Sequence, residues 1–179
     1  MENPNVPEEK TSTNLREKVR AVHSSNQRII ITVSIDPKDL KEKKEVLIEQ
    51  CHFNSVSSKI SNGFEDTEEI EAKVARIFYF GANTLSEAEV IAVMKAAGCI
   101  PGTLKHLLAA IKAGLKCKYI VVALGSRYMN EYNLNPALIP VATEDAGIQK
   151  DLRLVTEEMF DGHYALIGIE PETKKGLCD

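Results

Sequence analysis

Tryptophan is absent from this chain, and aromatic residues as a whole make up only 6% of it. No run of apolar residues approaches the roughly 18 that a membrane-spanning helix needs. The first thirty residues also lack the basic start and the apolar centre of a secretory signal peptide. We therefore expect a cytoplasmic protein that has no membrane partner.

A block of basic residues is also missing. Residues 1–80 carry 12 Lys and Arg against 14 Asp and Glu, and residues 81–179 carry 10 against 12, so each part has a net charge of −2. Proteins that bind nucleic acids usually gather their positive charge in one patch. The even mixture of charges argues against a nucleic-acid partner and indicates an ordinary mixed-charge surface.

Closely spaced metal ligands are absent. The four cysteines are Cys51, Cys99, Cys117 and Cys178, and the four histidines are His23, His52, His106 and His163. No two cysteines form a C-x-x-C pair, and the adjacent Cys51 and His52 would point their side chains apart in a strand or a helix. We expect free thiols that pack as small apolar side chains, histidines with structural roles, and no bound metal or cofactor.

The most regular part of the chain runs from residue 71 to residue 125. Its pattern predicts a strand up to Phe80, a helix over 86–97, a second helix over 103–114 and a buried, central strand over 119–125. Ser86 and Glu89 form one of two overlapping capping boxes, the other being Thr84 with Glu87. Gly98 is expected to end the first helix with a positive φ angle.

The rest of the chain predicts short strands and turns around these helices. Residues 28–36 alternate as a strand, residues 55–60 suggest a short edge strand followed by a turn at 61–63, and residues 143–150 are expected to form a turn. Pro136 and Pro140 bracket three apolar residues, so any strand there should be short and at an edge. No internal repeat is present.

The chain therefore divides into one domain and two tails. Residues 1–26 predict a mobile N-terminal tail with a possible short helix over 13–24, residues 27–170 a single domain, and residues 171–179 a C-terminal tail. The expected fold class is α+β, with a mainly antiparallel sheet and the two consecutive helices packed on one face. We expect Leu107, Leu108, Ile111, Val121 and Leu124 in its core.

Two segments carry a family resemblance. Gly98-x-x-Pro101-x-Thr103-Leu104-x-x-Leu107-Leu108-Ala109, followed by Val122-Ala-Leu-Gly-Ser126, resembles a family of small bacterial proteins with a G-x-R-P-A-T…E-L-L-A motif and a V-A-L-G-S motif. The resemblance covers about residues 29–169 and implies a fold but no activity. This chain departs from the family pattern at Ile100, Gly102 and His106, where the family has Arg, Ala and Glu.

The order of elements is similar to a second group. A strand, two helices and then several short strands joined by irregular loops is also the order found in C-type-lectin-like domains, which present variable loops for binding. This resemblance makes a C-type-lectin-like fold the alternative. Fold alone licenses no function.

Two loops carry the exposed candidates for binding. These loops are 126–135 and 143–150, and the candidate residues are Arg127, Tyr128, Tyr132, Glu144 and Asp145. Tyr and Arg contribute most at recognition surfaces, and loops held by a sheet often carry binding groups. We expect a non-catalytic binding or interaction module for another protein or a polar small molecule, unless the tyrosines only cover the core.

An enzyme is the alternative interpretation. A small hydrolase or transferase would have its site at the 126–139 loop, where Ser126 follows a buried strand. Ser126 lacks the G-x-S-x-G sequence of a nucleophile elbow, so we name no catalytic residue.

Overall fold

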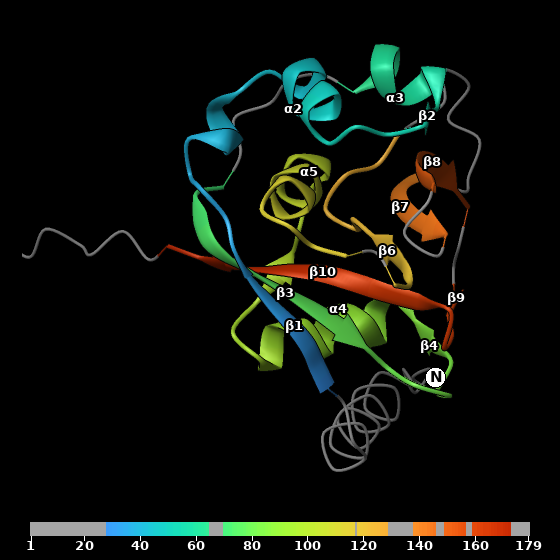
Figure 1. Cartoon of the computed structure of the whole chain (residues 1–179). Coiled ribbons are helices and arrows are strands. Elements are labelled where there is room, and N and C mark those ends of the chain that lie inside the picture. The colour runs from blue at the N-terminus through green and yellow to red at the C-terminus, as the bar shows by residue number, and fades with distance from the viewer. Residues whose placement is uncertain are drawn as a thin grey trace, which may run out of the picture.

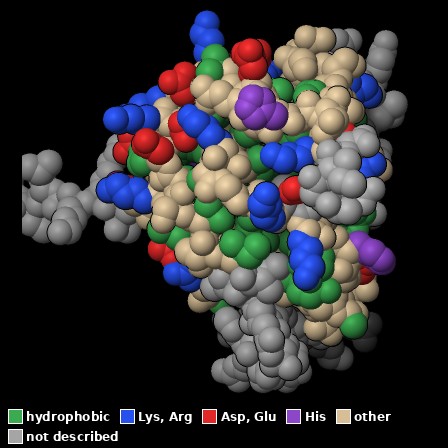
Figure 2. Space-filling view, viewed as in Figure 1, with side chains coloured by type: hydrophobic (Ala, Val, Ile, Leu, Met, Phe, Trp, Pro, Cys, Tyr) green, Lys and Arg blue, Asp and Glu red, His purple; other side chains and the backbone are tan. Residues whose placement is uncertain are grey.

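The computed structural model describes residues 28–64, 70–116, 118–128, 138–145, 149–156 and 159–172. The two predicted tails lie outside these residues, except for Pro171 and Glu172. The described chain contains both helices and strands, so the α+β class is confirmed. Figure 2 shows basic and acidic side chains next to one another on one face of the molecule.

One mixed sheet organises the fold, in the strand order β1-β3-β10-β6-β7-β8-β2 with β5 also paired to β10. Its strands are β1 (Arg28–Ser34), β2 (Ser55–Val56), β3 (Ala72–Tyr79), β5 (Ile100–Pro101), β6 (Ile120–Val122), β7 (Ile139–Asp145), β8 (Gln149–Val155) and β10 (Tyr164–Pro171). Two pairs, β10–β6 and β2–β8, are parallel and the others are antiparallel. A separate two-stranded sheet joins β4 (Leu85–Ser86) to β9 (Met159–Phe160).

Helices cover both faces of the main sheet (Figure 1). On one face lie α5 (Leu104–Lys112), α2 (Lys44–Gln50), α3 (Ser58–Gly63) and the short 3-10 helix η1 (Asp39–Lys41), and on the other lies α4 (Glu87–Ala96). Each face of the sheet has its own hydrophobic core. Strand β6 and the residues after it contribute to both cores, because successive side chains point to opposite faces. Val121 and Ala123 join the core under α5, whereas Val122 and Leu124 join the core under α4. The prediction that both long helices pack on one face is therefore wrong.

The link between α4 and α5 explains this difference. The chain leaves α4 through Gly98, whose φ is 73°, as predicted. It then forms strand β5, with Ile100 opposite Ile169 and Pro101 opposite Gly168 of β10. Because β5 lies within the plane of the sheet beside β10, the next helix begins on the opposite face. The short link is therefore a strand, which the sequence pattern did not predict.

Strand β7 also differs from its prediction, because it is seven residues long and lies between β6 and β8. Proline is tolerated here because Pro140 faces the end of β6. Its carbonyl oxygen accepts a hydrogen bond from the N–H of Ala123 at 3.0 Å, but the ladder pairs of β6 with β7 are only those of Val121 and Val122. The missing proline N–H therefore falls just past the β6–β7 pairing. The expected turn at 143–150 is also shorter, since β7 continues to Asp145 and β8 starts at Gln149.

Other expectations are confirmed or corrected locally. All five predicted core residues, Leu107, Leu108, Ile111, Val121 and Leu124, are buried. Strand β6 lies inside the sheet, although it is shorter than predicted. Strand β2 is a short edge strand as expected, but helix α3 replaces the predicted turn after it. Helix α4 uses the capping box of Ser86 and Glu89.

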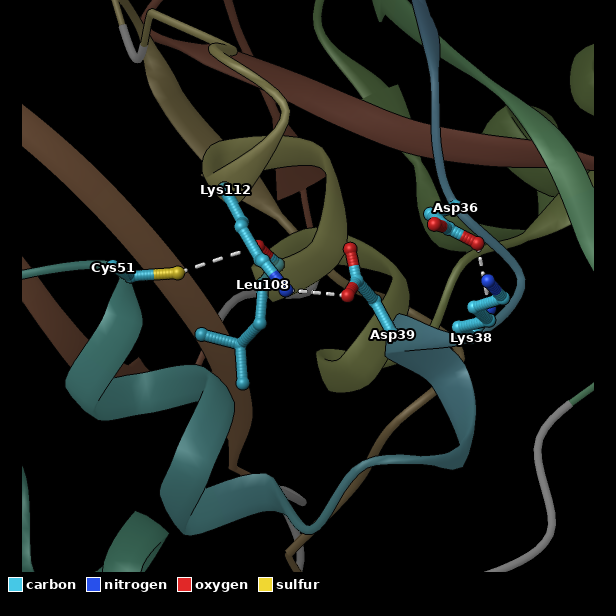
Figure 3. Close-up of polar contacts among 6 residues, drawn as sticks. All are labelled: Asp36, Lys38, Asp39, Cys51, Leu108 and Lys112. Atoms are coloured by element: carbon cyan, nitrogen blue, oxygen red, sulfur yellow. Dashed lines mark hydrogen bonds and ion pairs between the residues drawn. The ribbon is translucent and has the colours of Figure 1, made fainter.

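Lysine side chains hold the ends of the three short helices. Lys44 donates to the carbonyl oxygen of Ser61 near the end of α3 at 3.1 Å, Lys105 to that of Leu40 in η1, and Lys150 to that of Cys51 after α2. A cation at a helix C-terminus satisfies carbonyl groups that have no helical partner. Figure 3 shows the neighbouring contacts, in which Lys112 of α5 pairs with Asp39 and the Cys51 thiol points to the Leu108 carbonyl.

Candidate functional site

The segments 98–109 and 122–126 meet where α5 begins. The N–H of Gly125 donates to the carbonyl oxygen of Gly102 at 3.0 Å, and the N–H of Gly102 donates to that of Ile167 at 2.8 Å. A Cβ atom on Gly125 would lie 2.7 Å from the carbonyl oxygen of Pro101 and 2.9 Å from the carbonyl carbon of Gly102. Both contacts are to backbone, so a side chain there would force the two segments apart.

Gly125→Ala is therefore expected to destabilise the protein by about 2 kcal/mol or more, through overpacking against backbone atoms that cannot rotate away. Gly102→Ala is the matched control. Its Cβ would lie 3.1 Å from the Ile167 side chain and 3.2 Å from the Ile167 carbonyl oxygen, so it needs a smaller shift of its neighbours than a Cβ on Gly125. Urea unfolding of both variants checks the expectation. Equal stability of the two would show that the Gly125 contact is not tight in solution.

Ser126 has a structural partner at the same place. Its hydroxyl oxygen accepts a hydrogen bond from the backbone N–H of Leu104, the first residue of α5, at 2.8 Å. This bond satisfies one of the four N–H groups that a helix leaves free at its start. Ser126 therefore serves as a cap that comes from a distant part of the chain.

His106 completes the start of α5 from inside the core. Its Nδ1 accepts from the backbone N–H of Thr103 at 3.2 Å and lies 2.7 Å from the Thr103 hydroxyl, while its Nε2 lies 2.8 Å from the carbonyl oxygen of Ile70. Because Nδ1 accepts from the Thr103 backbone, Nε2 carries the proton and donates to Ile70. His106 is fully buried and takes the capping-box position that Glu usually fills.

Sequence reasoning missed this role, although the signal was available. The spacing of Thr103 and His106 is that of a capping box, with His106 at the position where Glu or Gln is usual. A ring nitrogen that accepts a hydrogen bond can do the work of the carboxylate. The second nitrogen then reaches a partner in a different segment, which a sequence cannot indicate.

Arg127 follows Ser126 but points to the other face of the sheet. It forms an ion pair with Glu87, the first residue of α4. Glu87 follows Ser86, which pairs with Met159 of β9. Met159 is 48% exposed and the Arg127 side chain is 39% exposed, so an apolar side chain and a guanidinium are both accessible near the start of α4.

Tyr128 turns back toward α3. Its ring lies 5.9 Å from the ring of Phe64 and 5.9 Å from the ammonium of Lys59, and a Cβ on Gly63 would lie 2.3 Å from it. Its backbone forms a bridge with Leu138. Tyr128 is half-buried in this packing, which agrees with the expectation that a tyrosine here could cover the core.

Glu144 and Asp145, two other predicted binding residues, do not join Arg127. Tyr132 lies outside the described residues. Glu144 and Asp145 lie at the end of β7, whereas Tyr128 pairs with Leu138 just before its start. Six residues of strand at about 3.4 Å each separate Leu138 from Glu144 by roughly 20 Å. Glu144 pairs across the β7–β8 hairpin with Lys150. The described residues Tyr128 and Glu144 of the two predicted loops thus lie near opposite ends of one strand.

The thiols of Cys51 and Cys99 are unreactive because both are buried. Burial raises the pKa of Cys51 to about 11, more than nearby Lys150 and Lys112 lower it, and burial likewise raises the pKa of Cys99. A thiol with a raised pKa is protonated at neutral pH and is a poor nucleophile and metal ligand. Within the described ranges, no three His, Cys, Asp or Glu residues come together as a metal site.

Comparisons of this chain with known proteins give no match. No helix among the described residues is long and apolar enough to span a membrane. No protein-family model, curated protein or solved structure matches the sequence or the fold.

Proposed function

We propose that this protein is a non-catalytic interaction module, and that it binds a partner protein through Arg127 and Met159. The observation that carries the proposal is the position of Arg127 beside Glu87, one residue along the chain from the Ser86–Met159 pair. Arg and Met are enriched in protein interfaces. A polar small molecule, the other ligand class expected from the sequence, would not need the exposed methionine.

The Arg127–Glu87 pair supports a binding role because it orients the guanidinium without burying it. The two side chains are 39% and 31% exposed. An ion pair this exposed contributes at most about 1 kcal/mol to stability. The planar guanidinium of Arg127 therefore remains available for contact with a partner. A partner that covers the pair would remove water from it and strengthen the interaction.

Met159 supports the proposal because it is exposed without a local structural reason. Among the described residues only Ile70 and Met159 are large hydrophobic side chains that are exposed. Methionine is unbranched and adapts to the shape of a partner surface. Its place on the two-stranded sheet of β4 and β9 holds it next to the start of α4.

The alternative, a small hydrolase or transferase with its site at the 126–139 loop, has less support. Its nucleophile would be Ser126, whose hydroxyl accepts from the Leu104 N–H. Among the described residues, the histidine at this end of α5 is His106. It is fully buried and hydrogen-bonded through both ring nitrogens, so it is not available as a general base for Ser126. These groups stabilise the start of α5, and that role accounts for their arrangement.

The test is capture of a partner on immobilised full-length protein, followed by measurement of its affinity after purification. Arg127→Ala and Met159→Ala are each expected to weaken binding about tenfold or more, the loss of at least 1.4 kcal/mol that defines an important interface residue. Lys43→Ala and Glu49→Ala, on exposed residues at α2, which covers the face of the sheet opposite α4, are the controls. Melting temperatures of all four variants should stay near that of the wild type.

Two results would contradict the proposal. The first is a partner whose affinity is equal for the wild type and both site variants. The second is turnover of an ester or acyl-transfer substrate that is lost in Ser126→Ala while the melting temperature is retained, because this would favour the enzyme.

A further inference from the structure

The two edges of the main sheet are built differently. One edge strand, β2, has only two residues, whereas β1 at the other edge has seven. Short edge strands and charged or proline-containing ones prevent proteins from pairing edge to edge. Residues 29–34 of β1, Ile-Ile-Ile-Thr-Val-Ser, include no charged residue and no proline. Among the described residues, the β2 edge therefore has the usual protection, whereas in β1 only its first residue, Arg28, is charged.

Strand β1 directs free hydrogen-bonding groups away from the sheet. Its register pairs Val33 with Ala75 and Ser34 with Val74 of β3, and the N–H of Ile35 donates to the carbonyl oxygen of Lys73. In an antiparallel pair, alternate residues bond to the partner strand and those between them face outward. The backbone N–H and C=O groups of Thr32 and Ser34 therefore point to the outer side of β1, where no strand of the described chain pairs with them.

The side chains of β1 fit a second copy of the same strand. Val33 and Ile35 belong to the core under α5, and Ile31 packs against it, while Thr32 and Ser34 are exposed on the other face. Two copies related by a two-fold axis perpendicular to the sheet would place both apolar faces on one side and both polar faces on the other. The absence of charge in residues 29–34 removes the repulsion that identical charged edges would meet.

We propose that two copies of this chain pair through antiparallel β1 strands, centred on Val33, and so form one continuous sheet across a dimer. In this register, Thr32 of each copy lies opposite Ser34 of the other, and the two pairs exchange four backbone hydrogen bonds. The irregularity between Ile29 and Ile31 limits the pairing to this central part of the strand. The interface is separate from Arg127 and Met159 and does not depend on the proposed function.

The first test is the mass of the full-length protein across a concentration series, by sedimentation velocity. The chain has a mass of 19.8 kDa, so the dimer is expected near twice that value and the monomer at dilution. Thr32→Pro should shift the protein to the monomer at all concentrations, because proline removes an outward N–H that β3 does not use. Thr32→Ser should leave the dimer intact.

The second test needs no variant and keeps the proposal open to contradiction if Thr32→Pro fails to fold. Hydrogen exchange of the Thr32 and Ser34 amides should be at least tenfold slower at concentrations where the dimer forms than at dilution. The Val33 and Ile35 amides, which face β3, should exchange at rates independent of concentration. A wild type that is monomeric at every concentration, a dimer that Thr32→Pro leaves unchanged, or equal exchange of the Thr32 and Ser34 amides at all concentrations would overturn the proposal.

Discussion

Replacing His106 with glutamate should destabilise the protein by about 2–4 kcal/mol, although glutamate is the usual residue of a capping box. The imidazole lies fully buried and bonds in two directions, to the Thr103 backbone N–H through Nδ1 and to the Ile70 carbonyl oxygen through Nε2. A carboxylate can replace the first bond because it also accepts. It cannot replace the second, because it would face the Ile70 oxygen with negative charge in a buried place.

His106→Gln is the matched variant for this expectation. Its amide is neutral and offers both an acceptor for Thr103 and a donor for Ile70, so its cost should be clearly smaller than that of glutamate. Urea unfolding at neutral pH measures both variants against the wild type, with helix content followed by circular dichroism. If His106→Glu were as stable as the wild type, the Ile70 contact would not exist in solution.

Leu108→Ala should cost about 2–5 kcal/mol, the range for truncating a fully buried leucine. Leu108 is completely buried at the centre of α5, in the core that this helix forms with the sheet and with η1, α2 and α3. The loss has two parts, the transfer free energy of the removed atoms and the cavity that they leave. The core is held from several directions, so it cannot collapse to fill that cavity.

The control is Lys116→Ala, which removes an exposed side chain just after the same helix and should change stability by less than about 0.5 kcal/mol. Chemical denaturation gives the free energy of unfolding of both variants. A loss below about 1 kcal/mol for Leu108→Ala would mean that the helix does not bury this position.

Residues whose role is set by their own neighbours in the sequence were predictable. The stripe of Leu107, Leu108 and Ile111 identified the buried side of α5, and Gly98 marked the end of α4 by its need for a positive φ. The capping box of Ser86 and Glu89 was one of two registers that the sequence allowed. The structure selects it because Leu85 and Ser86 pair with β9 and leave the next residue to start the helix.

The candidate binding residues illustrate the limit of this reasoning. Arg127 and Tyr128 are adjacent in sequence, yet one pairs with Glu87 of α4 and the other packs on Gly63 and Phe64 at α3. Met159 pairs with Ser86, the residue before the Glu87 that binds Arg127, and it carries no sequence signal because one exposed methionine is ordinary. Contacts between distant segments depend on strand order, and no local pattern encodes strand order.

The sequence by itself determined the two long helices, several of the strands and which side chains are apolar enough to be buried, because periodicity and capping act within a few residues. Tertiary structure alone decided which face each element covers. Strand β5 pairs with β10 and takes α5 to the face opposite α4, and Pro140 is accepted inside the sheet because β6 ends beside it. Both outcomes come from hydrogen bonds between residues far apart in the chain, and their geometry exists only once the sheet has formed.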